Sequence, residues 1–100
     1  MNHWGLFKPA ARLEFAEATA WYEKQRPGLG KEFVLEFERA LQRAQSDPAR
    51  FRKVLGQARM IRLRRFSKYC MYFAVEGGAF SILAVFHSSR NPAQLWPRLG

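Results

Sequence analysis

The segment Arg26-Pro27-Gly28-Leu29-Gly30 separates two stretches of helical periodicity and decides how the first half of the chain folds. Apolar residues recur at helical spacing on both sides of it. In residues 10–25 the apolar stripe is Ala11, Phe15, Ala18 and Tyr22. In residues 31–45 it is Phe33, Phe37, Ala40 and Ala44. A break this short forces the helices to fold back on each other. The sequence therefore predicts an antiparallel helical hairpin, with the aromatic stripes in its core.

The residues around this hairpin have the spacing and turns of strands. Residues 4–8 predict a short first strand, ended by Pro9, which suits the first turn of a helix. Residues 59–65 alternate in polarity, and residues 69–76 and 79–87 flank the turn Gly77-Gly78. Because residues 82–86 are apolar on both faces, we expect the last strand to be central. The predicted fold is a single α+β domain over residues 1–100, of order β-α-α-β-β-β, with the hairpin packed on a small, mostly antiparallel sheet.

Composition restricts the class of protein. The chain has 100 residues, of which 48% are hydrophobic, enough for one core. Its single cysteine, Cys70, excludes an internal disulfide and fits a reducing compartment. The longest apolar run, residues 82–86, is too short to span a membrane. The two histidines lie far apart without an acidic cluster, so we predict no metal site and no cofactor. We expect a cytoplasmic protein.

Positive charge is concentrated in the second half of the chain. The formal net charge is +9, yet residues 1–50 carry eight basic and seven acidic side chains. Residues 51–100 carry nine basic side chains against Glu76 alone. Such an asymmetric field attracts an acidic partner, such as nucleic acid or an acidic protein segment. Simple solubility is the alternative explanation of this charge.

Three motifs, in this order and spacing, resemble the RelE/ParE superfamily of bacterial type II toxins, over nearly the whole chain. The first is Tyr22, the Pro27-Gly28-Leu29-Gly30 break and Phe33 in the hairpin. The second is Phe66-Ser67-Lys68-Tyr69-Cys70-Met71-Tyr72-Phe73. The third is Ile82-Leu83-Ala84-Val85-Phe86-His87, followed by Arg90-Asn91-Pro92 and Trp96. The ParE branch fits better than the RelE branch.

The resemblance implies a toxin that a cognate antitoxin neutralises, without a cofactor. RelE-type members are ribosome-dependent messenger-RNA endonucleases, whereas several ParE-type members act on DNA gyrase. We therefore expect DNA gyrase as the target, with the ribosome and its message as the alternative. A third alternative is an inactive relative that acts only as a binding module. A homodimer and a toxin–antitoxin heterotetramer are both compatible with the resemblance.

RNA cleavage by a 2′-hydroxyl needs a base, a cation near the phosphate and an acid. The candidates for these roles are His87, Arg90, Arg62 and Arg64. In the resemblance, however, Cys70 falls where RelE-type nucleases carry a catalytic arginine, and Trp96 falls where some carry a catalytic tyrosine. Neither side chain can replace the lost group. We therefore favour no catalytic residue, and interpret His87 as a structural residue that ties down the loop of residues 88–91.

The strand of residues 59–65 is the candidate binding surface. Its alternation predicts that Arg62 and Arg64 project together on the face opposite Ile61 and Leu63. Guanidinium groups bind carboxylates and phosphates alike, so this surface suits an acidic antitoxin segment and, when free, the target; a solvated outer face is the alternative. The predicted partner-binding residues are Arg59, Arg62, Arg64, Arg65, Lys68, Arg90 and Trp96. An exposed Trp21 on the hairpin would also suit a partner interface.

Overall fold

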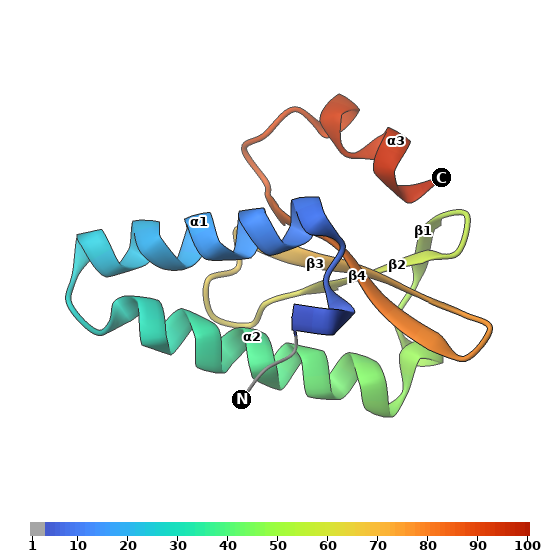
Figure 1. Ribbon diagram of the computed structural model, residues 1–100, viewed down its shortest axis with the longest axis horizontal. Coiled ribbons are helices and arrows are strands. Elements are labelled where there is room, and N and C mark those ends of the chain that lie inside the picture. The colour runs from blue at the N-terminus through green and yellow to red at the C-terminus, as the bar shows by residue number, and fades with distance from the viewer. Residues whose placement is uncertain (1–3) are drawn as a thin grey trace.

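The computed structural model describes residues 4–100 and consists of two long helices followed by a four-stranded sheet (Figure 1). The helices are α1 (Pro9–Gln25) and α2 (Leu29–Ser46), and the strands are β1 (Lys53–Leu55), β2 (Ala58–Arg62), β3 (Tyr69–Glu76) and β4 (Ala79–His87). A short helix α3 (Trp96–Leu99) ends the chain, and 3₁₀ turns form at Trp4–Leu6, Pro48–Arg50 and Pro92–Gln94. The predicted α+β class and helical hairpin are confirmed.

One carboxylate holds the turn between α1 and α2. Gly28 adopts a φ of 90°, in the left-handed region that favours glycine. The Glu23 carboxylate accepts hydrogen bonds of 3.1 Å from the backbone N–H groups of Gly28 and Gly30. Gly30 is also a point of close approach, because a Cβ there would lie 2.8 Å from the carbonyl oxygen of Thr19. The two glycines of the break therefore have separate roles, one in the turn and one in helix contact.

The sheet is antiparallel throughout, with strand order β1-β2-β3-β4. The β3–β4 hairpin turns at Gly77 and Gly78, both with positive φ, as predicted. The prediction that the last strand is central was wrong, because β4 lies at the sheet edge. It is apolar on both faces because the helices cover one face and the C-terminal segment covers part of the other.

Groups from outside the sheet cover the free edge of β4. Lys8 N–H donates to the Ile82 carbonyl at 2.9 Å, and the Arg98 guanidinium donates to the Leu83 carbonyl at 2.9 Å. The Val85 N–H in turn donates to the Glu14 carboxylate at 3.0 Å. A covered edge does not invite pairing with another strand.

The ends of two predicted strands differ from expectation. Residues 4–8 form no strand: Trp4–Leu6 is a 3₁₀ turn, and a single parallel bridge joins Phe7 to Ile82. Because Pro9 already begins α1, too few residues remain to extend this pairing. The strand predicted over residues 59–65 stops at Arg62, and the three-residue β1 that pairs with it was not predicted.

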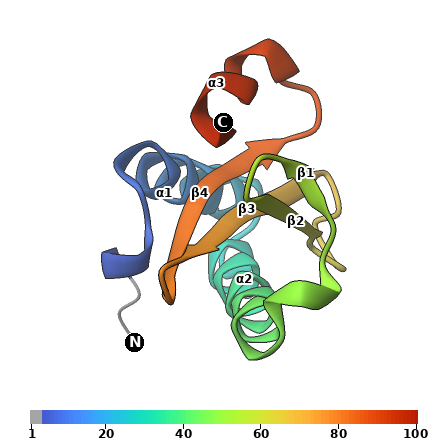
Figure 2. The same ribbon diagram turned by 90° about the vertical axis from the view of Figure 1, so that its right-hand side faces the viewer.

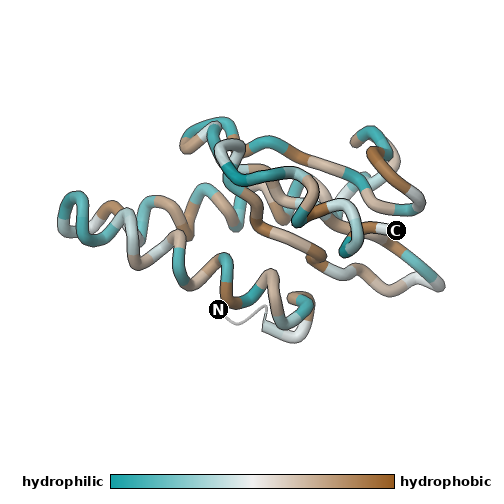
Figure 3. The backbone as a smooth tube through the Cα atoms, turned by 90° about the horizontal axis from the view of Figure 1, so that it is seen from above, coloured by the Kyte–Doolittle hydropathy of each residue, from teal (hydrophilic) through white to brown (hydrophobic). Residues whose placement is uncertain are grey.

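The sheet separates two apolar clusters. On its helix side, Phe33, Phe37, Met71 and Phe73 are all at most 2% exposed. On the opposite side, a smaller cluster joins the sheet to the C-terminal segment through Ala58, Ala84, Phe86, Leu95 and Leu99. Figure 2 shows α2 and α3 on opposite sides of the strands. The long helices contain both hydrophilic and hydrophobic residues along their length, whereas β3 and β4 are largely hydrophobic (Figure 3).

Candidate functional site

The arginines of the predicted binding strand point in different directions. Arg62 lies on the face of β2 away from the helices, opposite Cys70, and donates to the Ser67 carbonyl at 2.9 Å. Arg59 is half-buried on the other face and donates to the Phe51 carbonyl at 2.6 Å. Only Arg62 of these two is exposed for a partner.

Arg64 and Arg65 lie beyond the end of β2, on the side of α2. Their backbone N–H groups donate to the Glu36 carboxylate at 2.9 and 3.1 Å, and Glu36 is only 6% exposed. Arg65 also forms an ion pair with Glu32. The prediction that Arg62 and Arg64 project together was wrong, because β2 ends at Arg62 and the next residues are hydrogen-bonded to Glu36 of α2, which places Arg64 near Arg43 of that helix.

The face of the sheet away from the helices is only partly covered. The C-terminal segment packs on Ala84 and Phe86, while Met60 and Tyr72 stay half-exposed beside the exposed Arg62. We call the surface formed by Arg52, Met60, Arg62 and Tyr72 the open sheet face. Burial raises the pKa of the Tyr72 hydroxyl, and the nearby charges of Arg52 and Arg62 partly offset this shift.

Cys70 lies on the same face but is buried. Burial raises the pKa of its thiol, and Arg62 and Arg52 offset only part of the shift. The side chain is therefore a neutral thiol at neutral pH. It offers neither a nucleophile nor a cation.

A second site forms beside α1, over the ends of β3 and β4. It is a cleft of about 730 Å³ that brings together three of the predicted residues, Lys68, His87 and Arg90. Trp21 and Tyr22 of α1 line its other wall, and the Trp21 side chain is 56% exposed. We call this the aromatic–basic cleft. Arg62 and Trp96 do not line it.

Glu14 neutralises part of the charge in this cleft. Arg98 donates to its two carboxylate oxygens at 2.8 and 3.0 Å, and Arg90 donates to one of them at 2.6 Å. Burial alone would raise the pKa of Glu14, but the hydrogen bonds from Arg98, the Val85 N–H and Arg90 outweigh it and lower the pKa. Glu14 is thus a half-buried anion shared between the cleft and the C-terminal helix.

His87 has the structural contacts predicted for it. Its Nδ1 atom accepts a hydrogen bond of 3.0 Å from the Ser89 N–H and lies 2.7 Å from the Ser89 Oγ. The ring meets Tyr69 edge-on, with centroids 4.9 Å apart. These contacts fix the loop after β4 and leave only Nε2 for another partner.

A comparison of the sequence with models of protein families assigns the chain to a family. Residues 6–92 match the model of the ParE toxin of the parDE type II toxin–antitoxin system. The chain belongs to this family. A comparison with curated protein sequences gave no match. Family membership makes the chain a toxin component of a type II system and implies an antitoxin partner. In the part of the chain that the structure describes, no helix is long and apolar enough to cross a membrane.

Of the four candidate residues for RNA cleavage, the structure brings only His87 and Arg90 into one cleft. His87 and Arg90 line the aromatic–basic cleft, whereas Arg62 lies on the open sheet face. Arg64 lies on the side of α2, near Arg43. The pKa of the Arg43 guanidinium is lowered, first by burial and then by the charge of Arg64. Glu76, at the hairpin end of β3, is at the opposite end of the sheet from His87.

Sequence reasoning missed the two residues that organise the cleft, Glu14 and Arg98. A signal for Glu14 was present, because it falls three residues after Ala11 and four before Ala18, both buried. An acidic residue on the buried face of a helix needs a cationic partner. Nothing in the sequence shows that this partner comes from 84 residues further along the chain.

Proposed function

We propose that this toxin acts by binding rather than by cutting RNA, that its target is DNA gyrase, and that its cognate antitoxin neutralises it by covering its basic surfaces. The observation that carries the proposal is the ion pair of Arg90 with Glu14 at 2.6 Å. Among residues 4–100, Arg90 is the only arginine that lines the cleft beside His87. Although Glu14 also pairs with Arg98 and so offsets only part of the Arg90 charge, it holds this guanidinium, and Arg90 would have to leave Glu14 to contact a phosphorane.

The surroundings of His87 also favour a binding role. Its Nδ1 is occupied by Ser89, and no carboxylate forms a hydrogen bond to its ring within residues 4–100. A general base in a nuclease needs a partner that orients it and a cation on the scissile phosphate. The partner that orients His87 is the neutral Ser89, and the arginine in the same cleft, Arg90, is held by Glu14.

The aromatic–basic cleft has the composition of a protein-binding hot spot and is the proposed contact with gyrase. Tryptophan, tyrosine and arginine side chains carry much of the binding energy in protein interfaces. Trp21 is exposed on one wall, and Lys68 is exposed and forms no ion pair with any described residue. Binding a partner here would bury Trp21 without opening the core.

The open sheet face is the proposed docking surface for the antitoxin. Arg52 and Arg62 are exposed there and form no ion pair with a carboxylate of residues 4–100. Met60 of β2 and Tyr72 of β3 are cross-strand partners, and their half-exposed side chains offer apolar contact area. An acidic amphipathic segment matches this combination of charge and apolar area.

A supercoiling assay with purified gyrase tests the target. The wild-type toxin should inhibit supercoiling, and Trp21→Ala and Lys68→Ala should each weaken inhibition about tenfold or more. Lys24→Ala, which removes the same charge at the exposed end of α1, is the matched control and should inhibit normally. If supercoiling proceeds normally at high toxin excess, gyrase is not the target.

A translating extract tests the mode of action. The proposal predicts intact messages in the presence of the toxin. Truncated messages that disappear with His87→Ala would show ribosome-dependent cleavage and would overturn the binding mechanism. Expression without the antitoxin should arrest growth, and normal growth would identify an inactive relative.

A further inference from the structure

Three arginines that belong neither to the open sheet face nor to the aromatic–basic cleft lie beside the second half of α2. Arg43 is part of α2, Arg50 ends the 3₁₀ turn Pro48–Arg50, and Arg64 follows the end of β2. The Arg64 N–H donates to the Glu36 carboxylate at 2.9 Å, which holds the start of the loop after β2 against α2. Arg43 lies seven residues after Glu36, so two helical turns place both on one face of α2. We call Arg43, Arg50 and Arg64 the arginine cluster.

The members of this cluster repel one another. Arg43 is half-buried, and burial is the first cause that lowers the pKa of its guanidinium. The charge of Arg64 lowers this pKa further and that of Arg50 adds to the effect, whereas Glu36 acts in the opposite direction. The net direction is downward, so the folded chain holds these positive charges together against their repulsion. An external anion would relieve it.

The carboxylates near the cluster do not neutralise it. Glu36 is only 6% exposed, and it accepts hydrogen bonds from the backbone N–H groups of Arg64 and Arg65. Its other oxygen lies 3.8 Å from the Arg39 guanidinium. Asp47, just after α2, forms no ion pair with a residue of the range 4–100. Within that range, the three guanidinium groups of the cluster form no ion pair and no side-chain hydrogen bond either, so their donors are open to an external anion.

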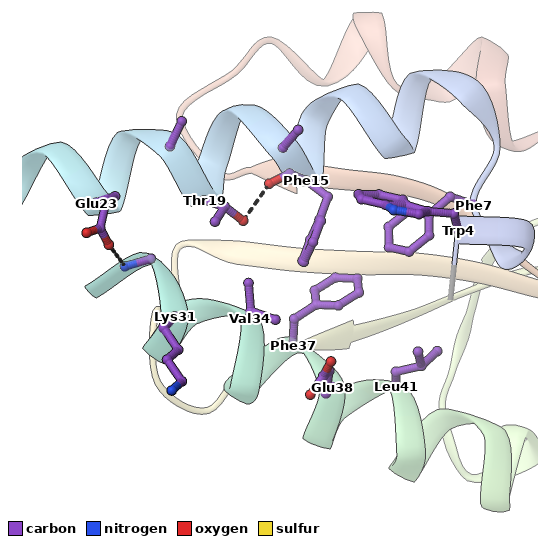
Figure 4. Close-up of a pocket in the computed structure, with 13 residues that line it drawn as sticks. Trp4, Phe7, Phe15, Thr19, Glu23, Lys31, Val34, Phe37, Glu38 and Leu41 are labelled. Atoms are coloured by element: carbon purple, nitrogen blue, oxygen red, sulfur yellow. Dashed lines mark hydrogen bonds between the residues drawn. The ribbon is translucent and has the colours of Figure 1, made fainter. Parts of the chain in front are cut away.

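The arginine cluster is separate from the apolar groove between α1 and α2. Figure 4 shows this groove, with Val34 on its α2 side. Arg43 follows Val34 by nine residues, a rotation of about 180° around the helix, so it lies on the other side of α2. The charged residues that line the groove are one lysine and two glutamates: Lys31, Glu23 and Glu38. Of these two surfaces, only the arginine cluster has an excess of cations to hold an anion.

We infer that the arginine cluster binds the phosphodiester backbone of duplex DNA. Each guanidinium presents a planar set of N–H donors that matches two phosphate oxygens. A duplex carries its phosphates in fixed rows, with about one negative charge per 1.7 Å of axis, so arginines from three elements can each meet a phosphate. Contacts with phosphates carry no sequence information, so binding should be independent of sequence. The inference needs only DNA and does not depend on gyrase as the target.

The surroundings of the cluster favour a duplex over the other acidic partners. A protein interface has an apolar core, but the apolar residues next to these arginines in the chain are already used: Ala44 and Leu63 are at most 1% exposed, and Phe51 packs against the core. A single strand gains affinity from aromatic rings on which its bases stack. The exposed tryptophans of residues 4–100 belong to other parts of the chain: Trp4, Trp21 and Trp96. The cluster therefore offers charge, which is the main source of affinity for a duplex backbone.

Fluorescence anisotropy with a short labelled DNA duplex tests the inference. For wild-type toxin purified free of antitoxin, the logarithm of the binding constant should fall linearly with the logarithm of the salt concentration between about 50 and 200 mM. Arg43→Gln, Arg50→Gln and Arg64→Gln should each weaken binding about fivefold or more and reduce the slope by about one unit. Lys24→Gln, which removes one positive charge from the last turn of α1, is the matched control and should leave the slope unchanged. A duplex of unrelated sequence should bind equally well.

Two further measurements separate phosphate contacts from damage to the fold. Arg64→Lys keeps the charge but loses the planar guanidinium, so it should weaken binding and keep the slope. Thermal unfolding of Arg50→Gln and Arg64→Gln should give midpoints no lower than that of the wild type, because each change removes repulsion of Arg43 and breaks no ion pair. Midpoints that fall together with the affinity would make these arginines structural and would overturn the inference.

A wild-type toxin that does not bind the duplex at about 50 mM salt would refute the inference. So would a slope that Lys24→Gln reduces as much as the cluster variants do, because binding would then reflect net charge alone. If polyglutamate, but not the duplex, binds with the same dependence on the three arginines, the cluster takes an acidic protein segment and the inference is wrong.

Discussion

At the scale of single residues, Glu14 has the largest share in connecting distant parts of the chain. Its carboxylate joins α1 to the edge of β4 and to Arg90 and Arg98, with its side chain only 9% exposed. Glu14→Gln would leave both guanidinium groups facing a neutral amide. We expect this change to lower the free energy of unfolding by about 2–4 kcal/mol, measured by urea denaturation. Glu17→Gln, on an exposed neighbour in the same cleft, should have almost no effect.

The lowered pKa of Glu14 gives this contribution a pH dependence of defined sign. Folding holds the pKa below the ordinary value of 4.5, so the unfolded chain binds more protons in acid than the folded chain does. The stabilisation is complete above the unfolded pKa and is lost as the pH falls through the folded pKa. The difference in unfolding midpoint between wild type and Glu14→Gln should therefore shrink from neutral pH to strong acid. A difference that stays constant would show that the charge of Glu14 is not its source.

Cys70 should be chemically inert in the folded toxin. It is buried, and burial raises the pKa of its thiol, so little thiolate is present and reagents have poor access to it. Alkylation by iodoacetamide at mildly alkaline pH should be at least about tenfold slower in the native protein than in denaturing urea, as followed by mass spectrometry. Equal rates would mean that the sheet opens readily around this strand.

At the scale of elements, Gly30 decides how closely α1 and α2 approach. Replacing a glycine in a helix with alanine usually stabilises it, by about 0.5–1 kcal/mol. Here the new Cβ would meet the Thr19 carbonyl at 2.8 Å, so Gly30→Ala should instead destabilise the toxin, by about 1–3 kcal/mol. Thermal unfolding should show this as a lower midpoint. Gly5→Ala, which meets nothing within 4 Å, should leave the midpoint unchanged.

The same elements show what sequence patterns could predict. The helical hairpin followed from local periodicity, because both its apolar stripes and its break lie within short stretches of chain. The position of β4 at the sheet edge could not be predicted from the sequence. A strand that is apolar on both faces has the same pattern whether helices or a chain terminus cover those faces. The direction of Arg64 did not follow either: alternation holds only while a strand lasts, and the buried carboxylate of Glu36 ends this one after Arg62.

Part of the candidate site was also within reach of the sequence. Lys68, His87 and Arg90 were named, and the structure brings them into one cleft, because β3 and β4 pair so that Tyr69 lies opposite His87. Their separation from Arg62 depends on which face of the sheet each residue occupies. The ion pair of Arg90 with Glu14 joins residues that are 76 positions apart, so no local sequence pattern could predict it.

At the scale of the whole molecule, the carboxylates that form ion pairs with arginines lie on the long helices α1 and α2. Glu14 of α1 and Glu32 and Glu36 of α2 each pair with at least one arginine. Arg52 and Arg62 on the open sheet face have no such partner within residues 4–100. The charges of these two arginines are therefore not offset by an ion pair on that face. Its field should guide an acidic partner to the open sheet face before any contact forms.

This field predicts how salt and position affect binding of the proposed antitoxin partner. The association rate with the cognate antitoxin should fall about tenfold or more from low to high salt, because screening weakens electrostatic steering. Arg62→Gln should lower the rate at low salt, as measured by stopped-flow fluorescence. Arg39→Gln removes the same charge from α2, where Arg39 lies 3.8 Å from Glu36, and should have a smaller effect. Equal effects would mean that net charge alone attracts the antitoxin, in which case the open sheet face is not where it first docks.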